Sequence, residues 1–106
     1  MHDNSSQSTS ESLPRFLVLL RQHIPQIEAV YLYGSQAQDS ATARSDIDVA
    51  VVSSYFAADI FQARLLLLQL AAQLDDRIEP PPFTPEGFTA SDPLVSEIQR
   101  TGVRLV

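Results

Sequence analysis

The sequence predicts an α/β protein in which a small mixed sheet packs against helices. Apolar residues recur with a helical period over 13–23 and over 57–74. Two shorter apolar runs, over 27–33 and 46–53, are typical of strands. The second of these contains Val-Ala-Val-Val without a polar interruption, so we expect that strand to be covered on both faces.

Prolines and caps place the remaining elements. Pro14 suits the first turn of the first helix, and Pro25 ends that helix. Three consecutive prolines over 80–82 cannot donate to a central ladder, so the strand that precedes them must be short or lie at an edge. The last predicted elements are a loop over 83–90, a helix over 94–100 with Asp92 as N-cap, Pro93 as its first residue and Gly102 as its end, and a strand over 103–106.

The helix over 57–74 carries more leucine than one core face needs. Ile60, Ala63, Leu67, Leu70, Ala71 and Leu74 keep a 3.6-residue period and are the expected core positions. Leucines 65, 66 and 68 widen the apolar stripe beyond that face. Two explanations stay open, a deeply packed helix or a helix that also faces a partner chain.

The length and composition indicate one domain. A chain of 106 residues has room for one core, which we expect over 13–106, after a disordered tail rich in Ser, Asn and Gln over 1–12. No apolar run approaches the ~20 residues of a membrane span, and the polar tail does not have the pattern of a signal peptide. Cysteine is absent from the sequence, which excludes disulfides and thiolate chemistry. We therefore expect a cytoplasmic protein.

The charge balance is acidic. The net charge is −6, the sequence holds no lysine, and its seven arginines are scattered. Proteins that grip a phosphate backbone without sequence preference usually present a basic face, so broad nucleic-acid binding is not expected. A single nucleotide remains compatible, because metal ions can neutralise its phosphates.

Asp46 and Asp48 stand two residues apart at the start of the second strand. Alternate strand residues share a face, so the two carboxylates lie on one face, roughly 6–7 Å apart along the chain. Like charges at this spacing repel one another, and burial strengthens the repulsion. A cation between them relieves it, and Mg²⁺, which prefers oxygen ligands and is often held by carboxylates and substrate phosphates, is the expected one. Mn²⁺ favours the same ligands.

The first strand ends at Gly34-Ser35. Glycine permits a backbone conformation that a Cβ forbids and allows another group to approach closely. Ser35 is then placed to cap a short helix over 36–38, and the free N–H groups of a helix N-terminus favour a phosphate. The turn is thus expected to hold phosphates while the next strand holds metal.

Gly34-Ser35, ten intervening residues and Asp46-x-Asp48 together resemble the signature of the DNA polymerase β-like nucleotidyltransferase superfamily. The sequence is most similar to the small stand-alone members of this superfamily, the minimal nucleotidyltransferases. The resemblance covers the chain from about residue 13 onwards. Asp39 departs from the pattern, because many members carry glycine there. The resemblance implies the polymerase-β-like nucleotidyltransferase fold.

The resemblance also implies a third carboxylate on a strand beside the Asp-x-Asp strand. Glu79 is our choice, with Asp75 and Asp76 as alternatives at the preceding turn. Asp46, Asp48 and Glu79 would hold two Mg²⁺ ions and act as the catalytic carboxylates, while Gly34 and Ser35 would bind the β and γ phosphates. Arg44 is a further candidate phosphate contact, the alternative being a solvated loop charge.

The implied reaction transfers a nucleoside monophosphate from a nucleoside triphosphate to an acceptor hydroxyl and releases pyrophosphate. Stand-alone members of this group pair with helical HEPN toxins, and the resemblance implies an antitoxin that moves AMP from ATP to a tyrosine of such a toxin. Two alternatives stay open. One is an antitoxin that neutralises its partner by contact alone. The other is an enzyme acting as a homo-oligomer on an antibiotic-type small molecule.

Overall fold

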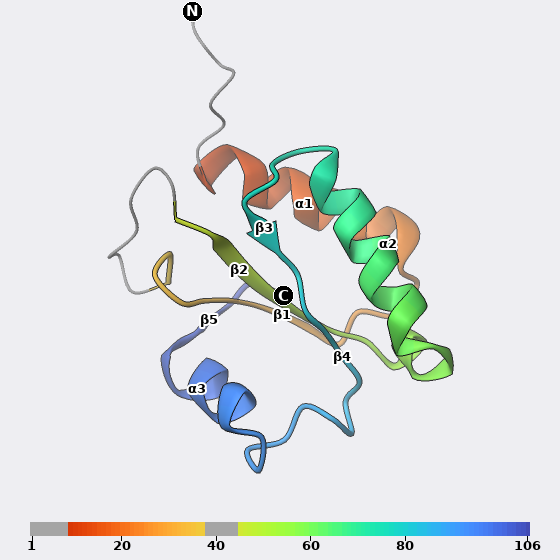
Figure 1. Ribbon diagram of the computed structural model, residues 1–106, viewed down its shortest axis with the longest axis vertical. Coiled ribbons are helices and arrows are strands. Elements are labelled where there is room, and N and C mark those ends of the chain that lie inside the picture. Colours follow the sequence, from red (N-terminus) through yellow and green to blue (C-terminus); the bar gives the residue numbers. More distant parts are fainter. Residues whose placement is uncertain (1–8, 38–44) are drawn as a thin grey trace, which may run out of the picture.

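A computed structural model describes residues 9–37 and 45–106, with side chains from residue 11 onwards, and shows a mixed α/β fold (Figure 1). No helix within those ranges is long and apolar enough to cross a membrane. The elements follow one another as α1 (Thr9–His23), β1 (Ala29–Tyr33), β2 (Ile47–Val52), the 3₁₀ helix η1 (Ser54–Ala58), α2 (Ile60–Ala72), β3 (Ile78–Glu79), β4 (Pro82–Phe83), α3 (Pro93–Thr101) and β5 (Val103–Arg104).

The sheet is small and mixed, as predicted. Its strand order is β3-β2-β1-β5, and β4 also pairs with β2. β1 runs antiparallel to β2 and β5, whereas β3 and β4 run parallel to β2. Because β3 pairs with the start of β2 and β4 with its end, the two short strands form one interrupted edge. The expectation of a short edge strand beside the prolines is confirmed.

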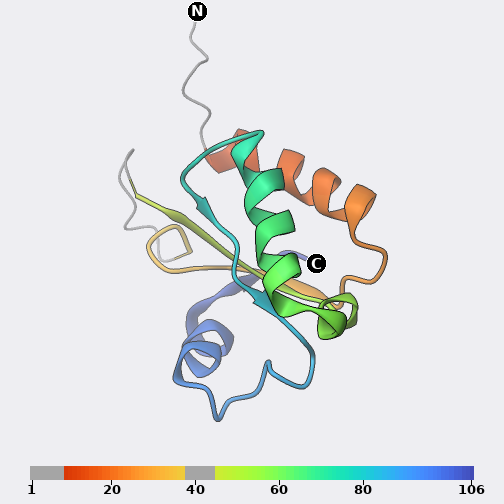
Figure 2. The same cartoon turned by 45° about the vertical axis from the view of Figure 1, so that its right-hand side comes forward.

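The helices cover the sheet on two sides. Figures 1 and 2 show α1 and α2 on one face and α3 on the other. On the α1–α2 face, the inward residues of β2 pack in one core with residues of both helices; this core includes Phe16, Leu20, Ile47, Val49, Val51, Leu67 and Leu70. Ala50 and Val52 point to the other face and are equally buried, as are Val95 and Ile98 of α3. The predicted two-sided burial of β2 is therefore confirmed.

The first helix begins earlier than predicted. It starts at Thr9 rather than at residue 13, so Pro14 lies inside the helix and not in its first turn. Residues 9–12 of the expected tail are thus helical, and residues 1–8 lie outside the described part of the chain. The extra turn has a tertiary anchor, because the Ser12 hydroxyl is fully buried and donates to Asp75 Oδ2 at 3.0 Å.

The helix predicted over 57–74 is two helices. The chain forms η1 first, and extended backbone at Asp59 then separates η1 from α2. The Asp59 carboxylate caps α2 by accepting from the N–H groups of Phe61 and Gln62. The prediction missed this cap because apolar residues continue on both sides of it.

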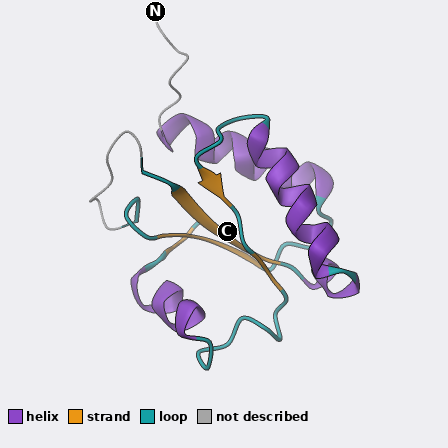
Figure 3. Cartoon of the chain, viewed as in Figure 1, coloured by secondary structure: helices purple, strands orange, loops and turns teal. Residues whose placement is uncertain are grey.

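The end of the chain combines a confirmed prediction with a missed strand. α3 lies between its N-cap Asp92 and Gly102 as predicted. β4, in contrast, occupies part of the expected loop. Carbonyl groups make this possible although proline donates nothing: Pro81 O accepts from Val51 N–H of β2 at 3.1 Å, and Phe83 O accepts from Ser53 N–H, directly after β2, at 2.9 Å. Figure 3 shows how little of this segment is regular strand.

Candidate functional site

Gly34 lies directly beside Asp48 in the candidate site. It ends β1 with φ of 73°, in the left-handed region. A Cβ added at this position would overlap the Asp48 carboxylate. Glycine is therefore required twice, for its backbone conformation and for the close approach of Asp48.

The residues after Gly34 form a turn rather than the predicted short helix. The described turn covers 34–37 and includes Ser35, while residue 38 lies outside the described residues. Arg44 and Asp39 also lie outside the described residues, so the phosphate contact assigned to Arg44 stays a prediction.

Strand register brings three polar side chains together. Asp48 pairs with Tyr33 of β1 in the antiparallel ladder and with Glu79 of β3 in the parallel one. Paired residues share a face of the sheet, and this face is opposite the core face of Ile47. Asp46 precedes β2 on an exposed position, two residues from Asp48. The register thus places Glu79, from a different part of the chain, directly beside Asp48.

The electrostatics of this face are unfavourable without a ligand. Burial raises the pKa of Asp48, and the charges of Asp46 and Glu79 raise it further. Burial and the charges of Asp48 and Glu79 also raise the pKa of Tyr33 to about 12, so its hydroxyl keeps its proton at neutral pH. These carboxylates supply the oxygen donors that Mg²⁺ prefers, and a bound cation would lower the repulsion.

The described side chains do not form a complete metal cage. In residues 9–37 and 45–106 as placed, no three carboxylate or imidazole groups converge closely enough to hold an ion together. This arrangement suits Mg²⁺, which is commonly bound by one or two carboxylates together with substrate phosphates and waters. The donor chemistry therefore fits a magnesium ion that arrives with a nucleotide.

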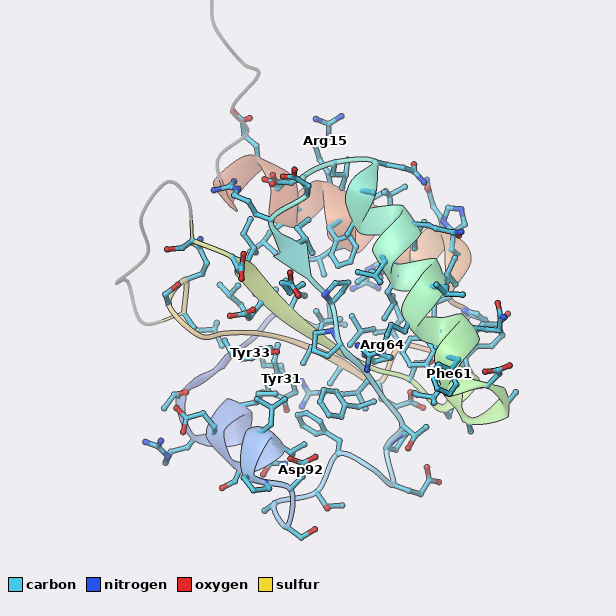
Figure 4. The ribbon with its side chains drawn as sticks, viewed as in Figure 1. Arg15, Tyr31, Tyr33, Phe61, Arg64 and Asp92 are labelled. Atoms are coloured by element: carbon cyan, nitrogen blue, oxygen red, sulfur yellow. The ribbon has the colours of Figure 1, made fainter. Side chains whose placement is uncertain are left out.

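A small hollow opens beside the acidic residues. It has a volume of about 170 Å³ and is lined by Tyr33, Asp48, Arg64, Leu68, Glu79, Pro80 and Pro81. Figure 4 shows Tyr33 on the sheet and Arg64 on α2. Arg64 makes no ion pair with any residue that the structure describes, so its charge is available to an anion. Sequence reasoning missed Arg64; the available signal was its being the one charged residue in the stretch 60–72.

The alternative third carboxylates lie elsewhere. Asp75 accepts hydrogen bonds from Ser12 and from the Arg77 side chain, and the Arg77 guanidinium holds the pKa of Asp75 below its usual value. Asp76 is exposed at the turn before β3. Glu79 alone of the three pairs with Asp48 in the sheet and lines the hollow.

Aromatic residues close the other half of the acidic face. Tyr31 stacks on Phe88 with ring centroids 5.2 Å apart, and Phe88 meets Phe83 edge-on at 5.3 Å. The Arg104 guanidinium lies 6.0 Å from the centre of the Tyr31 ring. These contacts hold the segment after β4 against the sheet.

The fold is that of a nucleotidyltransferase. Residues 18–106 match the family described as polymerase beta, nucleotidyltransferase, and the chain belongs to this family. The resemblance drawn from Gly34-Ser35 and Asp46-x-Asp48 is thereby confirmed at the level of the family.

Individual relatives give a more specific comparison than the family does. The protein adenylyltransferase MntA of Shewanella oneidensis is 38% identical over 66 residues, which are 61% of this chain and 46% of MntA. The chain thus spans about half the length of that relative. A chain of a toxin–antitoxin crystal structure with AMP-PNP is 30% identical with a TM-score of 0.66, and the match covers 88% of this chain and 71% of that one. A chain of the toxin–antitoxin MntA–HepT structure is 27% identical with a TM-score of 0.61, covering 92% and 72%.

Proposed function

We propose that this chain is a nucleotidyltransferase antitoxin that moves AMP from ATP to a hydroxyl group of a partner toxin. The observation that carries the proposal is the contact of Gly34 with Asp48, in sheet register with Glu79. A similar chain is named an adenylyltransferase, and another comes from a toxin–antitoxin structure with AMP-PNP. These likenesses support ATP as the substrate.

Different residues of the chain would bind the phosphates and the metal ions. The missing side chain at Gly34 leaves room for the Asp48 carboxylate against the backbone, and the Ser35 hydroxyl and turn N–H groups would bind the β and γ phosphates. Asp46, Asp48 and Glu79 would ligate two Mg²⁺ ions. When bound, these ions would neutralise the triphosphate and lower the pKa of the acceptor hydroxyl.

The transfer itself forms one bond and breaks one. The acceptor oxygen attacks the α-phosphorus of ATP, and the bond to the bridging oxygen of the β-phosphate breaks, so that pyrophosphate leaves. Glu79 would help to accept the proton of the acceptor hydroxyl. Arg64, across the hollow from the carboxylates, would hold a phosphate oxygen.

The small size of the hollow is evidence that the acceptor hydroxyl comes from another molecule. Its volume of about 170 Å³ is below the ~300–1,000 Å³ of ordinary ligand pockets. A nucleotide and an acceptor together would therefore extend beyond its walls, and a partner chain would complete the site. The acceptor we propose is a tyrosine of a HEPN-family toxin, with HepT as the available probe because similar chains form MntA–HepT complexes.

Mass spectrometry of HepT after incubation with this chain, ATP and Mg²⁺ tests the proposal. We expect HepT to gain the mass of AMP with the wild-type chain, and the gain to slow by about a hundredfold or more with Asp46→Asn/Asp48→Asn. Asp76→Asn, at an exposed position outside the site, is the matched control and should leave the rate unchanged. Chelation of the metal should stop transfer, and Mg²⁺ or Mn²⁺ should restore it.

Two outcomes would reject the proposed chemistry. HepT that is bound and neutralised but never modified would indicate an antitoxin acting by contact. Transfer to a small-molecule acceptor in the absence of HepT, with none to HepT, would indicate the antibiotic-type enzyme.

A further inference from the structure

Helix α2 is apolar on two sides. Its inner side, including Ala63, Leu67 and Leu70, is buried in the core. Its outer side exposes Phe61, Leu65 and Leu68, at 77%, 52% and 45% of their surface respectively. A surface helix ordinarily turns polar and charged residues outward, whereas on α2 these three large apolar side chains share the exposed surface with Gln62, Arg64 and Gln69.

The exposed residues form one continuous ridge. Phe61, Leu65 and Leu68 lie at i, i+4 and i+7, so they share a face of the helix, and we call them the α2 ridge. Figures 2 and 4 show this helix at the outer surface of the molecule, with Phe61 near its first turn. Scattered exposed apolar residues are common, but a contiguous group of large ones marks an interaction surface.

The ridge ends at the candidate site. Leu68 belongs to the ridge and also lines the hollow that Asp48 and Glu79 line. A molecule that packs along the α2 ridge therefore reaches the mouth of the acidic hollow. This continuity points to the acceptor-bearing partner as the occupant of the ridge.

Charge and chemistry favour one kind of occupant over the others. A nucleotide's phosphates gain nothing from leucine and phenylalanine side chains. A second copy of this chain would bring another net charge of −6 against the first, and like charges oppose association. The surface therefore suits a protein with an apolar patch and a net positive charge.

We propose that the α2 ridge is the docking surface for the protein that carries the acceptor hydroxyl, a basic protein whose apolar patch packs on Phe61 and Leu65 and whose acceptor residue enters the hollow past Leu68. This inference rests on the proposed transfer to a partner protein, and it adds where that partner binds.

Binding of HepT without ATP tests the docking surface separately from the chemistry. Phe61→Asp and Leu65→Asp place a charge on the ridge but outside the hollow, and Leu65→Gln is a milder change. We expect each Asp variant to raise the Kd for HepT by about tenfold or more. The matched control is Val18→Asp, an exposed apolar residue (54%) on the other helix α1 and not part of the ridge, which should change the Kd by less than about twofold. Circular dichroism checks that the variants keep their helices.

The transfer reaction provides the second readout. At low HepT concentration the ridge variants should modify HepT more slowly, and a saturating HepT concentration should restore the wild-type rate. Binding that requires the ridge but yields no modified HepT with the wild-type chain would reject the proposed function and keep the docking surface. The docking surface is overturned if the wild-type chain does not bind HepT, if ridge variants bind as tightly as Val18→Asp, or if light scattering shows a wild-type dimer that Phe61→Asp dissociates.

Discussion

Asp75 and Asp48 lie near opposite ends of the short strand β3, yet their environments shift their pKa values in opposite directions. Asp75 accepts from Ser12 Oγ at 3.0 Å, from the Arg77 N–H at 3.0 Å and from Arg77 Nη2 at 2.7 Å. These bonds favour the charged form, so the pKa of Asp75 is lowered. Asp48 is partly buried beside Asp46 and Glu79, so its pKa is raised.

The difference separates a structural carboxylate from a candidate catalytic one. The Asp75 carboxylate has its hydrogen-bond partners within the chain, and these bonds link the first turn of α1 to the turn before β3. Asp48 is held where its charge is unfavourable, which destabilises the fold and favours a cation. Ionisable groups with shifted pKa values are concentrated at functional sites. Asp48 is such a group, and it lies against Gly34 and lines the hollow.

The largest expected effect on stability comes from Asp75→Asn. The change removes the charge that pairs with Arg77 and weakens the bond from Ser12. We expect the free energy of unfolding to fall by about 2–3 kcal/mol at neutral pH, as measured by urea denaturation. Because the folded pKa of Asp75 is lowered, its contribution is present above the unfolded value of 3.8 and is lost as pH falls through the folded value. A difference from wild type that persisted unchanged at lower pH would contradict this role; Asp76→Asn is the control.

Gly34→Ala should have the second-largest effect on stability. It forces a side chain into the left-handed region and against the Asp48 carboxylate. We expect a loss of about 1–2 kcal/mol in stability, together with slower AMP transfer because Asp48 must move. Gly87→Ala is the comparison, since its φ is not in the left-handed region and its Cβ would meet Thr84 Oγ1 at 3.2 Å. Equal effects of the two variants on transfer would show that Asp48 is not held by Gly34.

Asp48→Asn should have the smallest effect on stability, and with the opposite sign. Removing this charge relieves its burial and its repulsion by Asp46 and Glu79, so the variant should be more stable than wild type at neutral pH. The gain should be less than about 1 kcal/mol, because the carboxyl is partly solvated and screened.

The pH dependence of that gain is the sharper test. The folded pKa of Asp48 lies above the unfolded value of 3.8, so the cost of its charge is absent below 3.8, grows as pH rises from 3.8 to the folded value, and is complete above that. The advantage of Asp48→Asn in thermal unfolding should therefore shrink as pH falls through that range, opposite to the behaviour of Asp75→Asn in sign. An Asp48→Asn variant less stable than wild type at neutral pH would show that the carboxylate is satisfied within the chain.

Local signals predicted the elements that local interactions decide. The helix α3 was found from Asp92, Pro93 and Gly102, because caps act within one turn. The start of α1 was misplaced because the bond between Ser12 and Asp75 spans 63 residues. β4 was missed because its hydrogen bonds depend on the neighbouring chain segment: the N–H groups of Val51 and Ser53 donate to the carbonyls of Pro81 and Phe83, although proline itself has no N–H to donate.

The sequence by itself determined the acidic pair and the glycine turn of this protein. Asp46 and Asp48 are neighbours along one strand and Gly34 ends another, so their chemistry follows from spacing and conformational preference within a few residues. Only the tertiary structure decided that Glu79 pairs with Asp48, that Arg64 and Leu68 of α2 border the same hollow, and that the α2 ridge stays exposed. These relations join segments that are distant in the sequence, through strand register and helix packing. A periodic pattern of apolar residues predicts an apolar face but does not show which surface covers that face.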